Sequence, residues 1–417
     1  ANELCACRCV LALARRCPLA FLDVCLRGAY LTYIRAFGRM QASAVPLARF
    51  MRNCIVELFG VNAATAYRIA FAYIRQLAVH LRAVVTGTAR DGARALQNWQ
   101  FVGALRVWTD VLCAHARART ASMHQLVYPL AQIVTGALDL CVGTPCLPVR
   151  FHLIAMMNDL TDACRVLVNP VVPLLRCLDT SELRRRARRG TILPLDFATL
   201  LHVSRQYLTS PELQDAVVRA FYEHMLRFLA ATSYSPAFPE LAVPVLAFLR
   251  RYRRESRIPL LSQQLAALVE KTTQNVAWIN AHRASATFLP RDRAAVAADA
   301  DGLENRVPQF FHGLVLCCVR EHGFCPAWNG NRGDAPGSAS PPRRSTSPAS
   351  STRATSRPPA PSSAASSASS RATATTARTT TTTRTTRTTL MARRMWKMRK
   401  KTLHVCAVVG VVLVTKK

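Results

Sequence analysis

The chain has 417 residues and half of them are hydrophobic, so it can bury one large core or two ordinary ones. This composition excludes a chain that is disordered throughout. A formal net charge of +32 predicts a polyanionic partner, such as RNA, DNA or an acidic protein surface. The charge is split evenly: residues 331–417 carry 17 basic residues and one acid, which gives +16, and residues 1–330 carry the other +16.

Aromatic residues make up only 7% of the chain, and Gly and Pro are scarce before residue 330, which predicts an all-α protein. The chain begins with Ala, so we expect a native start further upstream. Arg8, Arg15 and Arg16 interrupt the first apolar run, which argues against a signal peptide there. The apolar run Leu403–Val414 has 12 residues, too few to span a bilayer, so we expect no membrane contact.

Apolar residues recur at three- and four-residue steps from about residue 18 to 285, which predicts a succession of helices. In the helix expected at 67–85, three arginines recur every seven residues on the face away from the apolar stripe: Arg68, Arg75 and Arg82. The other helices are expected at 19–37, 45–59, 98–116, 124–141, 147–165, 195–208, 212–231, 239–254 and 259–283.

About ten helices on short turns could form a bundle or a stacked array. Because a single bundle core grows poorly beyond about 250 residues, we expect residues 1–300 to form an α-solenoid of degenerate HEAT/armadillo-like helix pairs. No strict sequence period is visible, so the repeats would be degenerate.

The composition changes near residue 300, which leaves 301–330 as a segment of uncertain character. Residues 331–417 are predicted to be a disordered, low-complexity basic tail, because Ser, Thr, Ala, Pro and Arg cannot bury enough surface. One hypothesis is that this tail comes from a shifted frame or a retained intron. A run of GAC codons for Asp would give ACG for Thr one base late, and CGA for Arg two bases late. We assign the tail no function.

Chemical motifs are missing, so we expect no enzyme, no cofactor, no metal and no small-molecule substrate. His80, His152 and His202 are each interpreted as packing residues on a helix. Asp159 and Asp162, one turn apart, are interpreted as a solvated helix face and not as an acid/base pair. The 15 cysteines are expected to be reduced and buried, and the alternating Cys5, Cys7 and Cys9 lack zinc-ligand spacing.

Two arginine clusters are the positive signal for nucleic-acid binding, because guanidinium groups pair with phosphates and Tyr252 could stack on a base. The alternative is that both clusters are solvated connections between helices. The candidate residues are Arg184, Arg185, Arg186, Arg188 and Arg189 in the first cluster, and Arg250, Arg251, Tyr252, Arg253, Arg254 and Arg257 in the second.

Aromatic side chains could also anchor a partner helix in the grooves of a helical array. For each one, packing within the chain is the preferred interpretation. The aromatics considered are Tyr30, Tyr33, Tyr73, Trp99, Trp108, Tyr128 and Trp278.

Six segments in the same order and spacing resemble the nucleolar complex protein 2 family. They are LRGAYLTYIRAF at 26–37, AYRIAFAYIRQLAVHLR at 66–82, NWQFV at 98–102, LVYPLAQIVTGAL at 126–138, FPELAVPVLAFLR at 238–250 and VEKTTQNVAWINAHRASATF at 269–288. Gln274-Asn275 replaces a Glu-Asn pair that is usual in the family, at what we interpret as a surface position. The resemblance stops near residue 298, where relatives continue into a helix and an acidic tail.

The resemblance implies a non-catalytic scaffold in the biogenesis of the large (60S) ribosomal subunit. It implies nucleolar complex proteins 1 and 3 and pre-60S particles as partners, with direct pre-rRNA contact as a further hypothesis, and a location in the nucleolus and nucleoplasm of the nucleus. Maturation and intranuclear transport of pre-60S particles would be the processes supported. The alternative is a chromatin/histone-binding regulator or a transport-receptor-like helical adaptor, which the basic charge disfavours.

Overall fold

The computed structural model is helical, and it describes residues 2–299 except 39–40, 118–120, 181–182, 184–192, 256–257, 288, 290, 293 and 297. No strand occurs among these residues, so the all-α prediction is confirmed for them. The α-helices are α1 (Asn2–Arg16), α2 (Leu19–Ala36), α3 (Val45–Phe59), α4 (Ala63–Val85), α5 (Trp99–His115), α6 (Val127–Leu140), α7 (Leu147–Cys164), α8 (Val171–Leu178), α10 (Pro211–Thr232), α11 (Phe238–Glu255) and α12 (Pro259–Ala284).

Most predicted helices lie where the sequence placed them, and α3 begins and ends at the predicted residues. Local signals explain several starts. The side chains of Asn62, Asn98 and Ser210 each accept a hydrogen bond from a backbone N–H three residues ahead, at 2.9, 2.8 and 3.3 Å. Two helices were missed: α1, whose apolar run is interrupted by arginines, and α8, which has only 8 residues.

The helix predicted at 195–208 is wrong. The segment is irregular, apart from a single 3-10 turn at Arg205–Tyr207. Asp196 caps its own turn by accepting the Ala198 N–H at 2.9 Å, and the Val203 N–H donates to the Pro145 carbonyl at 2.9 Å. Leu201 and Val203 are buried nevertheless. The apolar residues of this segment therefore pack in the core without forming a helix. A hydrogen bond to Pro145, in the turn before α7, takes the place of a helical hydrogen bond.

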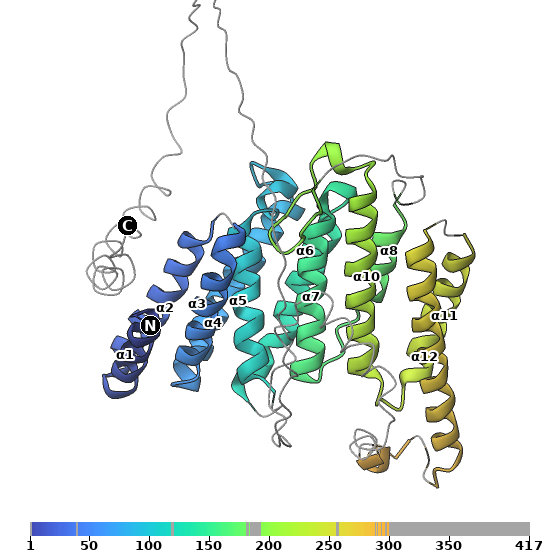
Figure 1. Ribbon diagram of the computed structural model, residues 1–417. Coiled ribbons are helices and arrows are strands. Elements are labelled where there is room, and N and C mark those ends of the chain that lie inside the picture. Colours follow the sequence, from blue (N-terminus) through green and yellow to red (C-terminus); the bar gives the residue numbers. More distant parts are fainter. Residues whose placement is uncertain are drawn as a thin grey trace, which may run out of the picture. The chain divides into compact units, whose positions relative to one another are not determined.

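The helices from α2 to α7 form two layers in which a helix contacts the next but one along the chain. One layer contains α2, α4 and α6, and the other contains α3, α5, α7 and α10. Figure 1 shows the helices following one another in chain order. Neighbours within a layer are parallel: Trp99 of α5 meets His152 of α7, and further along Arg106 meets Asp159.

Successive helices can also pair in the opposite direction, as α11 and α12 do. Glu240 near the start of α11 binds Arg283 near the end of α12 at 2.8 Å, and Arg250 binds Thr273 at 3.1 Å. As the residue number rises along α11 it falls along α12, so the two helices are antiparallel. The described part of the chain thus alternates antiparallel steps along the sequence with parallel neighbours in each layer.

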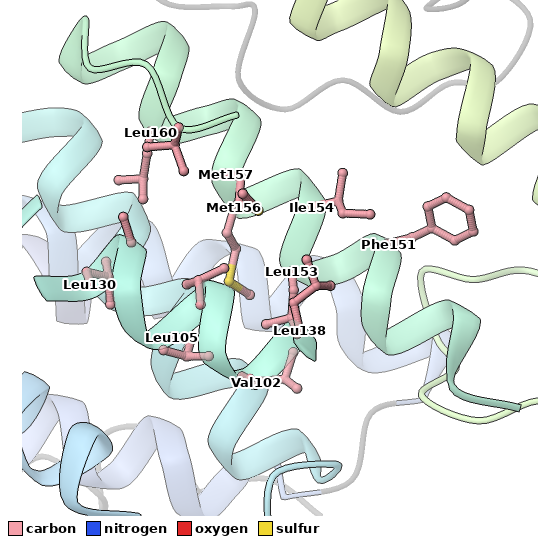
Figure 2. Close-up of a cluster of buried hydrophobic side chains, with 14 of the residues drawn as sticks. Val102, Leu105, Leu130, Leu138, Phe151, Leu153, Ile154, Met156, Met157 and Leu160 are labelled. Atoms are coloured by element: carbon pink, nitrogen blue, oxygen red, sulfur yellow. The ribbon is translucent and has the colours of Figure 1, made fainter. Parts of the chain in front are cut away.

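Helix α7 lies at the centre of the core, and none of its residues is exposed. Figure 2 shows its side chains, among them Leu153, Met156 and Leu160, meeting Leu105 of α5 and Leu130 of α6. Toward α2 the core becomes aromatic. Trp108 is fully buried and contacts Tyr30, Tyr73 and Phe59, with ring centroids 5.0, 6.0 and 5.3 Å away.

The interpretation of the aromatic residues as internal packing is confirmed for Tyr30, Tyr33, Tyr73 and Trp108, which are all buried. Trp99 and Trp278 are half-buried. The packing interpretation is wrong for Tyr128, which is 70% exposed. Residues 301–417, which include the segment at 301–330 and the low-complexity tail, lie outside the described residues. The shifted-frame hypothesis for the tail therefore stays a prediction.

Candidate interaction surfaces

The arginine clusters predicted from the sequence fall partly outside the described residues. Arg257 is one such residue, and so are all the members of the first cluster: Arg184, Arg185, Arg186, Arg188 and Arg189. Arg250, Arg251, Arg253 and Arg254 are exposed in the last turns of α11. The second cluster is therefore the one whose geometry can be followed.

Tyr252 lies on the buried face of α11 and not beside the arginines. Its side chain is 9% exposed, its ring stacks on Phe248 with centroids 5.9 Å apart, and its hydroxyl donates to the Leu178 carbonyl at 3.2 Å. Leu249 and Tyr252 are buried three residues apart, which is the spacing of a helix face that packs on its neighbours. The structure thus gives Tyr252 a packing role that joins α11 to the end of α8.

The four arginines differ in how they are held. Arg250 donates to Thr273 at 3.1 Å, and Arg251 lies 3.6 Å from Glu255 and over the Phe248 ring. Within the described part of the chain, Arg253 and Arg254 have no carboxylate partner. All four are exposed, so an anion could reach each guanidinium without rearrangement of the core.

A second basic surface lies on α4 and confirms the predicted arginine spacing. Arg68, Arg75 and Arg82 are all exposed. Phe71 is 49% exposed and Val79 is 60% exposed among them. Single exposed apolar residues are normal on protein surfaces, but here they share one helix face with the arginines.

A chain of ion pairs crosses the other layer. Arg52 of α3 binds Asp110 of α5 at 2.9 Å, and Asp110 also binds Arg106 at 3.0 Å. Asp159 of α7 then joins Arg106 to Arg227 of α10, with both distances 2.6 Å. We call these five residues the ion ladder. It links four helices of one layer through groups that are at most 19% exposed.

The interpretation of Asp159 as part of a solvated helix face is wrong, because the residue is 4% exposed. Burial raises its pKa, but Arg106 and Arg227 lower it by more and bring the pKa to about 2. Asp162 is half-buried, and burial raises its pKa. The pKa values of the two carboxyl groups are therefore shifted in opposite directions. The ionised Asp159 is already bound by two guanidinium groups.

His152 packs as predicted, whereas His80 and His202 are exposed, so the packing interpretation is wrong for those two. The Nε2 of His152 donates to the Leu200 carbonyl at 3.1 Å, and burial lowers the pKa of His152 to about 4. His224 stacks on Phe151 with centroids 5.8 Å apart. Burial and Arg227 lower the pKa of His224 to about 3. Both histidines are thus neutral at pH 7.

The described cysteines are free thiols, as predicted. The prediction that the cysteines are buried is confirmed for Cys164 and Cys177, whereas Cys54 and Cys113 are half-buried, and it is wrong for Cys9, which is exposed. No group of three His, Cys, Asp or Glu side chains among the described residues is arranged to hold a metal ion. None of the described helices combines the length and the apolar character that crossing a membrane requires.

A cavity of about 570 Å³ opens between the end of α6, the loop before α7, and α8. Arg150 and Arg176 line it, but so do Asp139 and Asp179. Arg150 is buried and donates to the Pro173 carbonyl at 3.2 Å. The balanced charge of the cavity does not favour a polyanion, in contrast to the arginines of α4 and α11.

Comparison with known proteins relates this geometry to one family. The family model described as "Noc2p family" matches residues 20–308. The chain is 32% identical over 293 residues to Nucleolar complex protein 2 of Drosophila melanogaster, covering 70% of this chain and 38% of that relative. It is 30% identical over 274 residues to Nucleolar complex-associated protein 2 of Arabidopsis thaliana, covering 66% of this chain and 36% of that relative.

A more distant relative is the Nucleolar complex protein 2 homolog of Caenorhabditis elegans, which is 27% identical over 247 residues. That alignment covers 57% of this chain and 34% of the relative. The chain therefore spans between a third and two-fifths of the length of these relatives. The matched region contains the described helices from α3 to α12 and α2 without its first residue, and with them both basic surfaces and the ion ladder.

Proposed function

The chain belongs to the Noc2p family, and on that premise we propose that it is a non-catalytic scaffold in the biogenesis of the large (60S) ribosomal subunit. It acts in the nucleolus and nucleoplasm of the nucleus, where it supports maturation and intranuclear transport of pre-60S particles. The observation that carries the proposal is the family match over residues 20–308, which includes the layered helices and their exposed basic faces.

The fold that fits this function is an α-solenoid of degenerate HEAT/armadillo-like helix pairs over residues 1–300. Parallel neighbours within each layer and the antiparallel pair α11 and α12 support it, since stacked helix pairs produce both features. Such an array presents many helix faces and holds partners by shape and charge. The basic tail at 331–417 keeps no assigned function.

The proposed partners are nucleolar complex proteins 1 and 3 and the pre-60S particle. The names of the relatives, which describe proteins of a nucleolar complex, support the protein partners. The net charge of +32 supports a polyanionic neighbour such as pre-rRNA. No cofactor, membrane or small-molecule substrate belongs to the proposal.

Direct pre-rRNA contact is proposed for the arginines of the two clusters. Arg253 and Arg254 support it best, since both are exposed and pair with no carboxylate among the described residues. Arg184, Arg185, Arg186, Arg188, Arg189 and Arg257 belong to the same proposal from their sequence alone. Phosphate pairing of this kind gives affinity and orientation but cannot read base sequence.

Sedimentation of the tagged full chain from cells that express it tests the main proposal. We expect it to co-sediment with pre-60S particles, to shift to light fractions after RNase treatment, and to carry nucleolar complex proteins 1 and 3 with it. Depletion should reduce 60S subunits relative to 40S subunits. Salt-stable histone binding without rRNA would instead support the chromatin or helical-adaptor alternative and overturn the proposal.

RNA contact at α11 is tested by the charge-reversed variant Arg253→Glu/Arg254→Glu of the full chain, with a labelled pre-rRNA fragment in fluorescence anisotropy. Losing two phosphate contacts should lower the salt slope of log K by about 1.4 to 1.8, at about 0.7 to 0.9 for each contact. The matched control is Arg75→Glu/Arg82→Glu, which changes the net charge equally on α4. Equal slopes for the two variants would rule out a specific contact at α11.

A further inference from the structure

The outer face of α4 combines three arginines and two apolar side chains in one narrow stripe. At 3.6 residues per turn, Arg68, Phe71, Arg75, Val79 and Arg82 fall within an arc of about 80°. All are exposed, with Phe71 at 49% and Val79 at 60%. The opposite face of α4 carries the buried Ile69, Tyr73 and Leu77, so this stripe faces away from the core.

Phe71 is held in position although its ring is half-exposed. Tyr67, one turn earlier, stacks beside it with ring centroids 6.2 Å apart. The Tyr67 hydroxyl in turn donates to Gln125 just before α6, at 3.5 Å. An aromatic side chain supported on one side and open on the other loses little conformational freedom when a partner covers it, as is typical of interface anchors.

The charge around this stripe is strongly positive, and of its three arginines Arg68 alone pairs with a carboxylate among the described residues. Helices α2 and α4 together carry five arginines and one acid, which leaves +4. That acid, Asp23, already binds Arg27 at 2.6 Å and Arg68 at 2.7 Å. Among the described residues, Arg75 and Arg82 have no carboxylate partner, so the stripe is complementary to negative charge.

We infer that the outer face of α4 docks an acidic amphipathic helix of a partner protein. Arg68, Arg75 and Arg82 repeat every seven residues, about 10.5 Å along the helix axis at 1.5 Å per residue. A partner helix with Asp or Glu at every seventh position presents carboxylates at that interval, and apolar residues between them cover Phe71 and Val79. This inference rests on the proposed scaffold function and names the chemistry of its protein partner.

RNA is the other anion that could occupy the stripe, and the apolar residues argue against it. A phosphate backbone would pair with the arginines but would leave Val79 exposed to water. Val85 of the same helix, which is 64% exposed, would also stay exposed. A helix buries these side chains and neutralises the arginines together. The arginines on α11 have no comparable exposed apolar partners in their last turn.

Binding of the full chain to the nucleolar complex partners named above gives the first test. Arg75→Glu/Arg82→Glu should weaken binding of one of them at least about tenfold, and Phe71→Ala should weaken it about fivefold, because a central anchor is lost. The control Arg253→Glu/Arg254→Glu makes the same charge change on α11 and should alter binding by less than about twofold. Unchanged circular dichroism and melting temperature show that each variant folds.

Photo-crosslinking identifies what lies on the stripe. With p-benzoylphenylalanine in place of Val79, the crosslinked peptide should be a helical segment with acidic residues spaced by seven. Replacing those acids with Arg should restore binding to Arg75→Glu/Arg82→Glu. Crosslinks to RNA, a non-acidic segment, or equal binding by all variants would overturn the inference. If the wild-type chain binds neither partner, the proposed function fails first, so the two failures are distinguishable.

Discussion

Arginines serve opposite purposes in the two layers of this helical array. In one layer, the helices α5 and α7 together carry two arginines and three aspartates, which leaves a net charge of −1, and Arg106 is enclosed by Asp110 and Asp159. In the other layer, the helices α2 and α4 together carry five arginines and one aspartate. Arg106 is 19% exposed, whereas Arg75 and Arg82 are exposed and have no carboxylate partner among the described residues. The same residue type thus connects helices in one layer and leaves positive charge on the surface of the other.

The difference follows from what surrounds each guanidinium. A buried charge is costly unless a partner of opposite sign and good geometry compensates it, which Asp159 does with two bonds of 2.6 Å. An exposed guanidinium is solvated by water and needs no partner. The ion ladder should therefore govern stability, and the α4 stripe should govern association. The predictions below separate these two contributions.

The largest effect is expected for Asp159→Asn. The amide fills the same space but leaves Arg106 and Arg227 without their shared negative charge, so the free energy of unfolding should fall by about 3 kcal/mol or more. Chemical denaturation followed by circular dichroism measures this loss. The control Asp139→Asn removes a carboxylate that is 62% exposed and pairs with Arg176 at 3.5 Å, so it should cost less than about 0.5 kcal/mol.

A double-mutant cycle with Arg227→Gln sharpens this prediction. Both single variants break the same Asp159–Arg227 pair, so the double variant should lose less than the sum of the single losses, by more than about 1 kcal/mol. Additive losses would mean that Asp159 acts through packing alone. In that case the ion ladder would be a consequence of the fold and not one of its supports.

Acid should weaken the fold in a pH window set by two histidines that pack within the helical array, His152 and His224. The pKa of His152 is lowered to about 4 and that of His224 to about 3, so the unfolded chain binds protons before the folded chain does. Keeping these histidines neutral costs no folding stability above the ordinary histidine pKa. The cost grows as the pH falls from about 6.5 toward 4. Each histidine should cost about 1.4 kcal/mol of unfolding free energy per pH unit in that window.

Asp159 affects stability at a lower pH than the two histidines do, so its titration does not interfere with the measurement of theirs. Its folded pKa of about 2 lies below the ordinary value of 3.8, so its stabilising contribution is complete above 3.8 and is lost as the pH falls toward 2. Denaturation at several pH values between 4 and 7 covers the histidine window, in which the raised pKa values of the carboxyl groups of Asp162 and Glu223 act in the opposite direction. His224→Phe keeps a ring against Phe151 and should remove the contribution of one histidine, about 1.4 kcal/mol per pH unit, from the wild-type slope, while the exposed His202→Gln should leave the slope unchanged.

The sequence predicted the helices well where an apolar stripe and a cap coincide. Asn98 before α5 and Ser210 with Pro211 at the start of α10 are such cases, because a local hydrogen bond determines where each helix begins. The segment 195–208 shows the limit of this approach. Its Leu201 and Val203 are buried only two residues apart, Asp196 caps a turn, and Val203 bonds to Pro145 just before α7.

Polar residues were predicted less well, because burial depends on contacts distant in sequence. The sequence indicated a solvated Asp159, but in the structure Arg106 and Arg227, which are 53 and 68 residues away, enclose it. Asn275 was assigned to the surface, but it is fully buried and donates to the Ser233 carbonyl at 3.0 Å. The three-residue step from Leu249 to Tyr252 was a visible signal that Tyr252 belongs to the core. No sequence signal indicated which neighbour its hydroxyl would meet.

The smallest effect on stability is expected for the arginines of the α4 stripe. Arg75→Gln/Arg82→Gln removes two exposed charges without described carboxylate partners, so the free energy of unfolding should change by less than about 0.5 kcal/mol. Arg52→Gln is the counterpart in the ion ladder: it is 16% exposed and binds Asp110 at 2.9 Å, so its loss should cost about 1 to 2 kcal/mol. Denaturation of both variants under identical salt compares the layers directly. If Arg75→Gln/Arg82→Gln lost as much stability as Arg52→Gln, Arg75 and Arg82 would be structural. They would then not be available to bind a partner.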